Sequence, residues 1–153
     1  MGDVGDFFMH VKLPEKHINA FRFLFWEGDP GSNIDIIRMI AHLFGAKPSS
    51  SVATFAFQQC ARDNAPWFSP EAILALLEEM YVDDFIKSFE EEDDGLKLIK
   101  ELMQICSCGG FQIGKWLSNS KKIMESIPKD RQEISHGRRK RCQVGRPCFR
   151  HEI

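Results

Sequence analysis

The sequence predicts an α+β domain whose mostly antiparallel sheet carries helices on one face. Short segments rich in aromatic and β-branched residues alternate with longer segments whose apolar residues recur at helical spacing. Of 153 residues, 43% are hydrophobic, which is enough for one buried core. The order of the segments indicates a split βαβ arrangement of the ferredoxin-like type.

The first predicted elements are strands. Val4–Leu13 is rich in Phe and Val and ends at a proline. Phe21–Trp26 is an aromatic strand, closed by a turn at residues 28–32. Ile34–Phe44 fits a strand or a helix. Its β-branched residues and the glycine that follows favour a strand in its second half.

Three helices, a hairpin and a last strand follow. Val52–Asn64 has helical spacing after a run of serines that can cap it, and Ser69–Met80 begins with a capping serine and a proline. Glu90–Cys106 opens with five acidic residues, which suit the positive end of a helix dipole, and stops at a Gly-Gly pair. Tyr81–Ile86 is predicted to be a hairpin, and Phe111–Leu117 a strand.

Charge is distributed unevenly along the chain. It holds 20 Lys+Arg and 22 Asp+Glu, of which six basic residues and one acidic residue stand in residues 138–153. That end therefore has a net charge of +5, against −7 for the rest. We predict a domain over residues 1–130 and a basic, disordered tail over residues 131–153. The acidic body does not attract a polyanion by bulk charge, whereas the tail suits phosphate contact or nuclear import.

The sequence shows neither a membrane span nor an export signal. No apolar run approaches the roughly 20 residues of a span, and the chain starts with acids instead of a basic, apolar leader. We expect a protein that is cytoplasmic or nuclear, not secreted, with no membrane partner. Five cysteines then fit reduced thiols. The spacing of Cys142, Cys148 and His151 matches no standard zinc site, so none is expected.

Asp83 and Asp84 form the sharpest chemical feature of the sequence. Two adjacent carboxylates aimed at one point raise one another's pKa, and a divalent cation removes that cost. The plain alternative is a polar hairpin turn, because Asp is a good turn residue. A further acidic segment, Asp-Val-Gly-Asp-Phe-Phe at residues 3–8, favours the metal interpretation.

Together, Tyr81–Asp84 and residues 3–8 resemble the catalytic palm of a reverse transcriptase. More closely, the chain is similar to the polymerase of BEL/Pao-type LTR retrotransposons. The resemblance covers about residues 2–130, and its supporting segments stand in the family's order: Phe21–Trp26 with residues 28–31, His42–Ala46, Phe68–Ala72 and Gly109–Ser120. It implies a polymerase palm-like fold and RNA-directed DNA polymerase activity.

The resemblance also implies a set of metal ligands. Two Mg²⁺ or Mn²⁺ ions would serve nucleotidyl transfer onto a primer 3′-hydroxyl. Asp3 is the implied ligand of the first motif, joined by the Val4 carbonyl. Asp83 is implied to bridge the ions, with Asp84 supporting the site beside it. These three acids are the implied catalytic residues.

Val4, Phe8, Gly45, Ala46 and Lys115 are the nucleotide-binding residues that the resemblance implies. Phe8 matches an aromatic gate that excludes a 2′-hydroxyl by bulk, and its alternative role is a core aromatic. Gly45 and Ala46 match the segment beneath the nascent base pair, although proline comes earlier here than in the family. Lys115 matches a lysine near the leaving pyrophosphate, and its alternative is a solvated surface lysine.

The implied partners are an RNA or DNA template with its primer, deoxynucleoside triphosphates, and the remaining segments of a retroelement polyprotein. The family places fingers before this region and a thumb after it, so we expect a palm fragment that is weak or inactive alone. One alternative is a non-catalytic nucleic-acid-binding or interaction module that keeps the palm fold. Another is an unrelated α+β domain in which Asp3 lies far from the hairpin.

Overall fold

The computed structural model describes residues 1–26, 28 and 33–133. Most of the turn predicted at residues 28–32 lies outside these described residues. So does the basic tail from residue 134 onward, which includes Cys142, Cys148 and His151.

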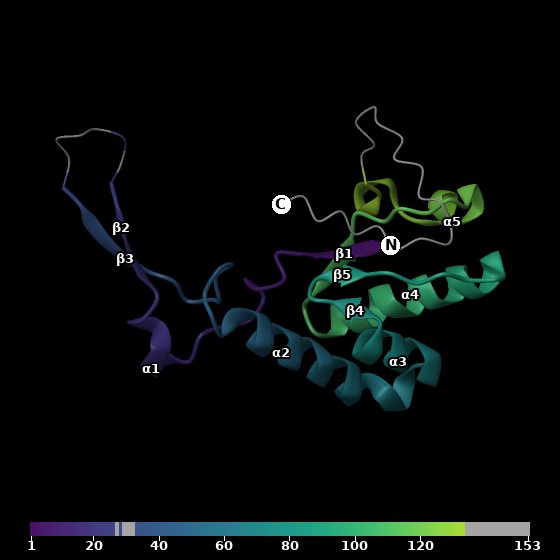
Figure 1. The fold of residues 1–153 in the computed structure, drawn as a ribbon, viewed down its shortest axis with the longest axis horizontal. Coiled ribbons are helices and arrows are strands. Elements are labelled where there is room, and N and C mark those ends of the chain that lie inside the picture. The colour runs from purple at the N-terminus through teal and green to yellow at the C-terminus, as the bar shows by residue number, and fades with distance from the viewer. Residues whose placement is uncertain (27, 29–32, 134–153) are drawn as a thin grey trace, which may run out of the picture.

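Four short strands form the main sheet, in the order β4-β5-β1-β6 with every neighbouring pair antiparallel (Figure 1). The central strand β1 (Gly2–Gly5) pairs with β5 (Asp84–Phe85) on one side and with β6 (Gln112–Gly114) on the other. β4 (Met80–Tyr81) completes the predicted hairpin with β5. The predicted α+β class with an antiparallel sheet is confirmed.

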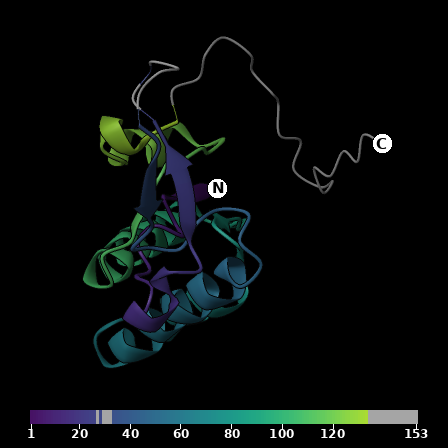
Figure 2. The ribbon, with the colours of Figure 1, turned by 90° about the vertical axis from the view of Figure 1, so that its left-hand side faces the viewer.

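Three long helices lie on one face of this sheet (Figures 1 and 2). They are α2 (Ser49–Asn64), α3 (Pro70–Glu78) and α4 (Glu92–Cys108), so the predicted helices are confirmed with small shifts of their ends. The predicted cap of α3 forms, because the Ser69 hydroxyl accepts a hydrogen bond of 3.2 Å from the backbone N–H of Ala72.

The core lies between the sheet and these helices. Val4 of β1, Phe85 of β5 and Ile113 of β6 are buried in it, together with Leu76 of α3 and Leu102 of α4. Successive side chains of a strand point to opposite faces. The residues next to these buried ones therefore lie on the sheet face that the three helices leave open.

β2 (Arg22–Phe25) and β3 (Asp35–Arg38) pair with each other in a ribbon that projects away from the main sheet (Figure 1). The expectation that they join a single sheet is wrong. The predicted position of the strand within Ile34–Phe44 is also wrong, because β3 lies in the first half of that segment and not in the second. Every residue of both strands is exposed, so no buried face ties the ribbon to the main sheet. A backbone hydrogen bond of 2.9 Å from Leu13 to Ile40 helps to hold its base.

Four short elements of the described chain were not predicted from the sequence: α1 (Glu15–Ile18), η1 (Ala65–Trp67), α5 (Lys121–Ser126) and η2 (Lys129–Arg131). After η2, the backbone of Trp116 receives a hydrogen bond of 3.1 Å from the N–H of Glu133 and donates one of 2.9 Å to Arg131. These contacts include residues 131–133, which follow the predicted boundary at residue 130. Within the described ranges, no helix has the length and hydropathy needed to cross a bilayer.

Candidate metal centre

Asp3 and the acidic hairpin lie side by side in the main sheet. Asp3 is paired with Asp84 across the antiparallel strands β1 and β5, and the N–H of Val4 donates a hydrogen bond of 2.8 Å to the carbonyl of Asp83. Opposite residues in such a pair have Cβ atoms about 4.5–5.5 Å apart and share one face of the sheet. The alternative of an unrelated domain places Asp3 far from the hairpin, whereas the register places it beside the hairpin.

The carboxylates of Asp3, Asp83 and Asp84 interact electrostatically. All three residues are partly buried. Burial, followed by the charges of Asp83 and Asp3, raises the pKa of the Asp84 carboxyl. Like charges therefore oppose full ionisation of the group, which is the condition that a bound cation relieves.

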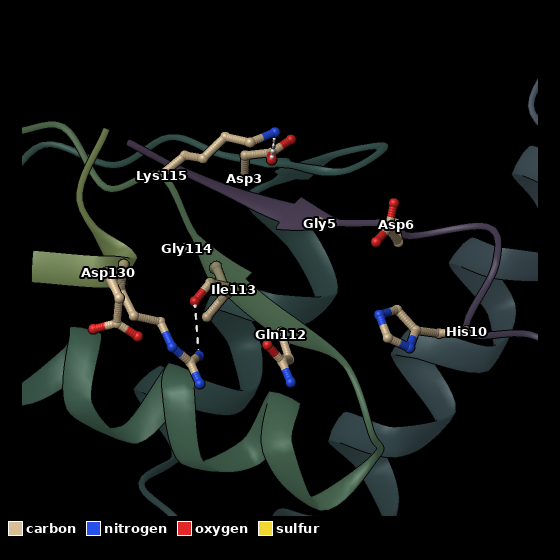
Figure 3. A pocket seen from close by; sticks show the side chains of 10 residues that line it. Asp3, Gly5, Asp6, His10, Gln112, Ile113, Gly114, Lys115 and Asp130 are labelled. Carbon is tan, nitrogen blue, oxygen red and sulfur yellow. Dashed lines mark hydrogen bonds and ion pairs between the residues drawn. The ribbon is translucent and has the colours of Figure 1, made fainter. Parts of the chain in front are cut away.

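Lys115 approaches Asp3 from the β6 side of β1, whereas Asp84 lies on the β5 side. Lys115 follows Gly114, which pairs with Asp3 across β1 and β6, and its Nζ lies 2.6 Å from Oδ2 of Asp3 (Figure 3). That oxygen is buried and receives no well-directed hydrogen bond, so the contact is best described as an ion pair. The contact raises the pKa of the Lys115 ammonium.

Three non-glycine residues of the described chain have positive φ, and each stands close in sequence to this site. Val82 (φ 59°) is in the hairpin turn before Asp83, Asp6 (φ 51°) follows β1, and Lys115 (φ 46°) follows β6. A β-branched residue such as Val82 is an outlier in that region of φ. Strained backbone is concentrated at functional sites in proteins, and this observation points to the same place as the carboxylates.

A hollow of about 370 Å³ opens beside Asp3 on the open face of the sheet (Figure 3). Asp6 and His10 line it from the segment after β1, and Asp130 and Arg131 line it from η2. Sequence patterns predict no role for these four residues. Asp6 belongs to the quoted acidic motif and His10 follows it closely, but no sequence signal brings residues 130 and 131 to the hollow.

Phe8, Gly45 and Ala46, which are expected to contact the nucleotide base and sugar, do not line the hollow at Asp3. Phe8 is partly buried and packs edge-to-face against Phe7 and Phe44, with ring centroids 5.5 and 5.9 Å away. Gly45 and Ala46 follow Phe44, and Gly45 has a φ of 83°. The Phe8–Phe44 contact therefore brings this loop to Phe8, while the hollow at Asp3 is lined by other residues.

The donor set fits a hard divalent cation in chemical type. Asp3, Asp83 and Asp84 offer the oxygen ligands that Mg²⁺ prefers. Val4 has only its backbone to offer, because its side chain is buried in the core. In the described part of the chain, no three His, Cys, Asp or Glu side chains are already grouped as a metal site.

Comparison with known proteins adds no family assignment. No protein-family model matches the chain, and no curated protein matches it significantly.

Proposed function

We propose that this chain is the palm region of a reverse transcriptase of the BEL/Pao retrotransposon type. Its activity as part of a polymerase is RNA-directed transfer of deoxynucleotides onto a primer 3′-hydroxyl. The observation that carries the proposal is the register of β1 and β5, which sets Asp3 opposite Asp84.

The topology supports the palm assignment. Along the chain, β1 is followed by helices, the β4–β5 hairpin, α4 and β6, and in space β1 lies between β5 and β6. This is the connectivity of a split βαβ fold. It leaves one sheet face without the long helices, and a primer–template would approach the carboxylates from that face.

The three acids account for the chemistry of the proposal. Asp3 and Asp83, with the Val4 carbonyl and the support of Asp84, would hold two Mg²⁺ or Mn²⁺ ions. When bound, such ions activate the attacking hydroxyl and neutralise the leaving pyrophosphate. The protein's own part is to keep the acids on one strand pair, where backbone hydrogen bonds fix their spacing.

The remaining residues would select and hold the nucleotide. Phe8 would limit the space at the sugar, and its contact with Phe44 keeps its ring beside the loop at Gly45 and Ala46. Lys115, whose ammonium lies within the acidic group, would interact with the nucleotide phosphates. Both roles depend on the metal centre being real.

The proposed partners are an RNA or DNA template with its primer, deoxynucleoside triphosphates and the other segments of a retroelement polyprotein, in the cytoplasm or the nucleus. We expect weak or no activity from this chain alone, because phosphate contacts supply most of the affinity for nucleic acid and its body is acidic.

A non-catalytic module that keeps the palm fold is the second candidate. The absence of a ready-made ligand set in the described residues and the ion pair on Asp3 favour it. It predicts no divalent cation at the carboxylates and no effect of replacing Asp83.

A titration with Mn²⁺, followed by electron paramagnetic resonance of the free ion, distinguishes the two candidates. We expect saturable binding to the parent chain and a loss of affinity on the order of tenfold in Asp83→Asn. Asp94→Asn, which alters an exposed acid at the start of α4, is the matched control and should bind like the parent. Absence of saturable binding, or equal affinity in the two variants, would overturn the proposed metal centre.

A further inference from the structure

We propose that Lys115 is an internal counter-ion of Asp3 that must leave before a divalent cation binds, and that it therefore weakens the binding of that cation. This inference rests on the proposed function, because it concerns the same carboxylates. It assigns to Lys115 a role in metal loading, in addition to any contact with a nucleotide.

The geometry of Asp3 makes the competition direct. Oδ2 of Asp3 is buried, has no well-directed hydrogen bond, and lies 2.6 Å from the Lys115 ammonium. A Mg²⁺ ion bound to the same oxygen would sit about 2.0–2.1 Å from it. An ammonium and a divalent ion cannot both lie that close to one oxygen without strong repulsion.

The backbone delivers Lys115 to this position. Gly114 is fixed opposite Asp3 by the pairing of β1 with β6, and Lys115 follows with a positive φ of 46°. A lysine has no intrinsic preference for that conformation, so the fold itself directs the residue there. The backbone at the end of β6 therefore positions the Lys115 ammonium against Asp3.

Release of the side chain is easy. The Lys115 side chain is 67% exposed, whereas that of Asp3 is 22% exposed. The lysine can therefore turn into solvent without disturbing the core, while the carboxylate it leaves remains partly buried beside Asp83 and Asp84. A divalent cation that replaces it supplies twice the charge to the same acids.

The chain offers a matched ion pair for comparison. Lys122 Nζ lies 2.5 Å from Oδ1 of Asp93, and both side chains are more than half exposed. Lys122 and Asp93 lie on α5 and α4, apart from the acids of the main sheet. Removing the charge of Lys122 changes the net charge of the protein as removal of Lys115 does, without touching the proposed metal centre.

The test compares Mn²⁺ dissociation constants of the parent, Lys115→Met and Lys122→Met, with circular dichroism to verify folding. We expect Lys115→Met to bind Mn²⁺ about fivefold more tightly, which corresponds to the upper range of an exposed ion pair, and Lys122→Met to match the parent. Lys115→Arg retains the positive charge and should remain close to the parent. Lys115→Gln replaces Lys115→Met if the latter does not fold.

The outcomes separate this inference from the proposed function. If all lysine variants bind Mn²⁺ with equal affinity, or if Lys115→Met binds it less tightly, the counter-ion role is wrong, and the metal centre stands when Asp83→Asn still weakens binding. If Lys122→Met tightens binding as much as Lys115→Met, net charge explains the effect and the inference fails. If no variant binds Mn²⁺, the metal centre itself is wrong, and the inference fails with it.

Discussion

Asp3 and Asp84 lie directly opposite each other on two neighbouring antiparallel strands, although most of the domain separates them in the sequence. Like charges in that position destabilise a strand pair. The Lys115 ammonium offsets part of this repulsion from the opposite side of β1. Repulsion within the acidic group therefore lowers the stability of the folded protein, as is often found at binding sites.

The first prediction concerns Asp84. Because its pKa is raised in the folded protein, ionisation of Asp84 destabilises the fold at pH values above both its folded and unfolded pKa. Asp84→Asn should therefore increase the free energy of unfolding at pH 7 by about 0.5 kcal/mol, the scale of a partly exposed charge interaction. The gain should disappear as the pH falls below the folded pKa, where the parent carboxyl is protonated as well.

Urea unfolding in the presence of a chelator, at pH 7 and at about pH 3.5, measures this difference, since the ordinary pKa of Asp is near 3.9. Asp94→Asn is the control and should show no such gain. A loss of stability in Asp84→Asn at pH 7 would mean that Asp84 makes favourable contacts that outweigh the repulsion.

The second prediction concerns the glycines of β1. A Cβ atom added at Gly2 would lie 2.8 Å from ring carbons of Trp116, which is fully buried and cannot move aside. Gly2→Ala should therefore lower the free energy of unfolding by about 1–3 kcal/mol and shift β1, with Asp3, from its register.

Gly5→Ala is the matched control in the same strand, because the nearest atom to its added Cβ is 4.0 Å away. It should change the free energy of unfolding by no more than about 0.5 kcal/mol. Chemical denaturation of both variants gives the comparison, and equal destabilisation would contradict the described packing of Gly2 on Trp116.

The third prediction is a pH dependence that originates at His42. This side chain is buried, with Nδ1 3.2 Å from the hydroxyl oxygen of Ser49. Burial, and then the charge of His17, lowers the pKa of His42 below its ordinary value of 6.5. The unfolded chain thus takes up a proton before the folded chain does, so stability is full above about pH 6.5 and falls as the pH decreases through the lowered pKa.

Unfolding free energies at pH 7.5 and pH 5.5 test this, with an expected decrease on the order of 1 kcal/mol in the parent. His42→Gln should reduce that decrease, whereas His10→Gln, which alters an exposed histidine, should keep it. An unchanged decrease in His42→Gln would assign the pH dependence to other groups.

The fourth prediction concerns the thiols at the end of α4. Burial raises the pKa of Cys106 to about 12, and burial followed by the neighbouring Cys108 raises the pKa of Cys60. Cys108 is exposed. Because the thiolate is the reactive form, iodoacetamide at pH 7.5 should modify the three cysteines within residues 33–133 in the order Cys108, then Cys60 more slowly, and Cys106 only after denaturation. Peptide mass spectrometry follows each site separately, and equal rates at Cys106 and Cys108 would contradict the packing of α4.

Local sequence signals were sufficient for the long helices. The spacing of apolar residues, the serine at position 69 and the Gly-Gly pair at 109–110 predict α3 and α4 to within a few residues. These features act over one or two turns of chain, so neighbouring residues determine them. The hairpin at Tyr81–Ile86 was predictable for the same reason.

The sheet to which β2 and β3 belong was not predictable in this way. Their aromatic and β-branched residues predict strands, and strands form. However, the residue pattern of a strand does not show which strand it pairs with, because pairing between distant strands depends on which faces the core buries. The ribbon therefore forms its own sheet.

The sequence by itself determined which groups are present at the candidate centre: three carboxylates and a lysine, in segments that form strands and a turn. Only the tertiary structure decided their arrangement, in which Asp3 is paired with Asp84 across two strands and the Lys115 ammonium forms an ion pair with Asp3. The physical reason is that the burial of Val4, Phe85 and Ile113 fixes the register of β1, β5 and β6. Once alternate residues of those strands face the core, their neighbours must meet on the opposite face.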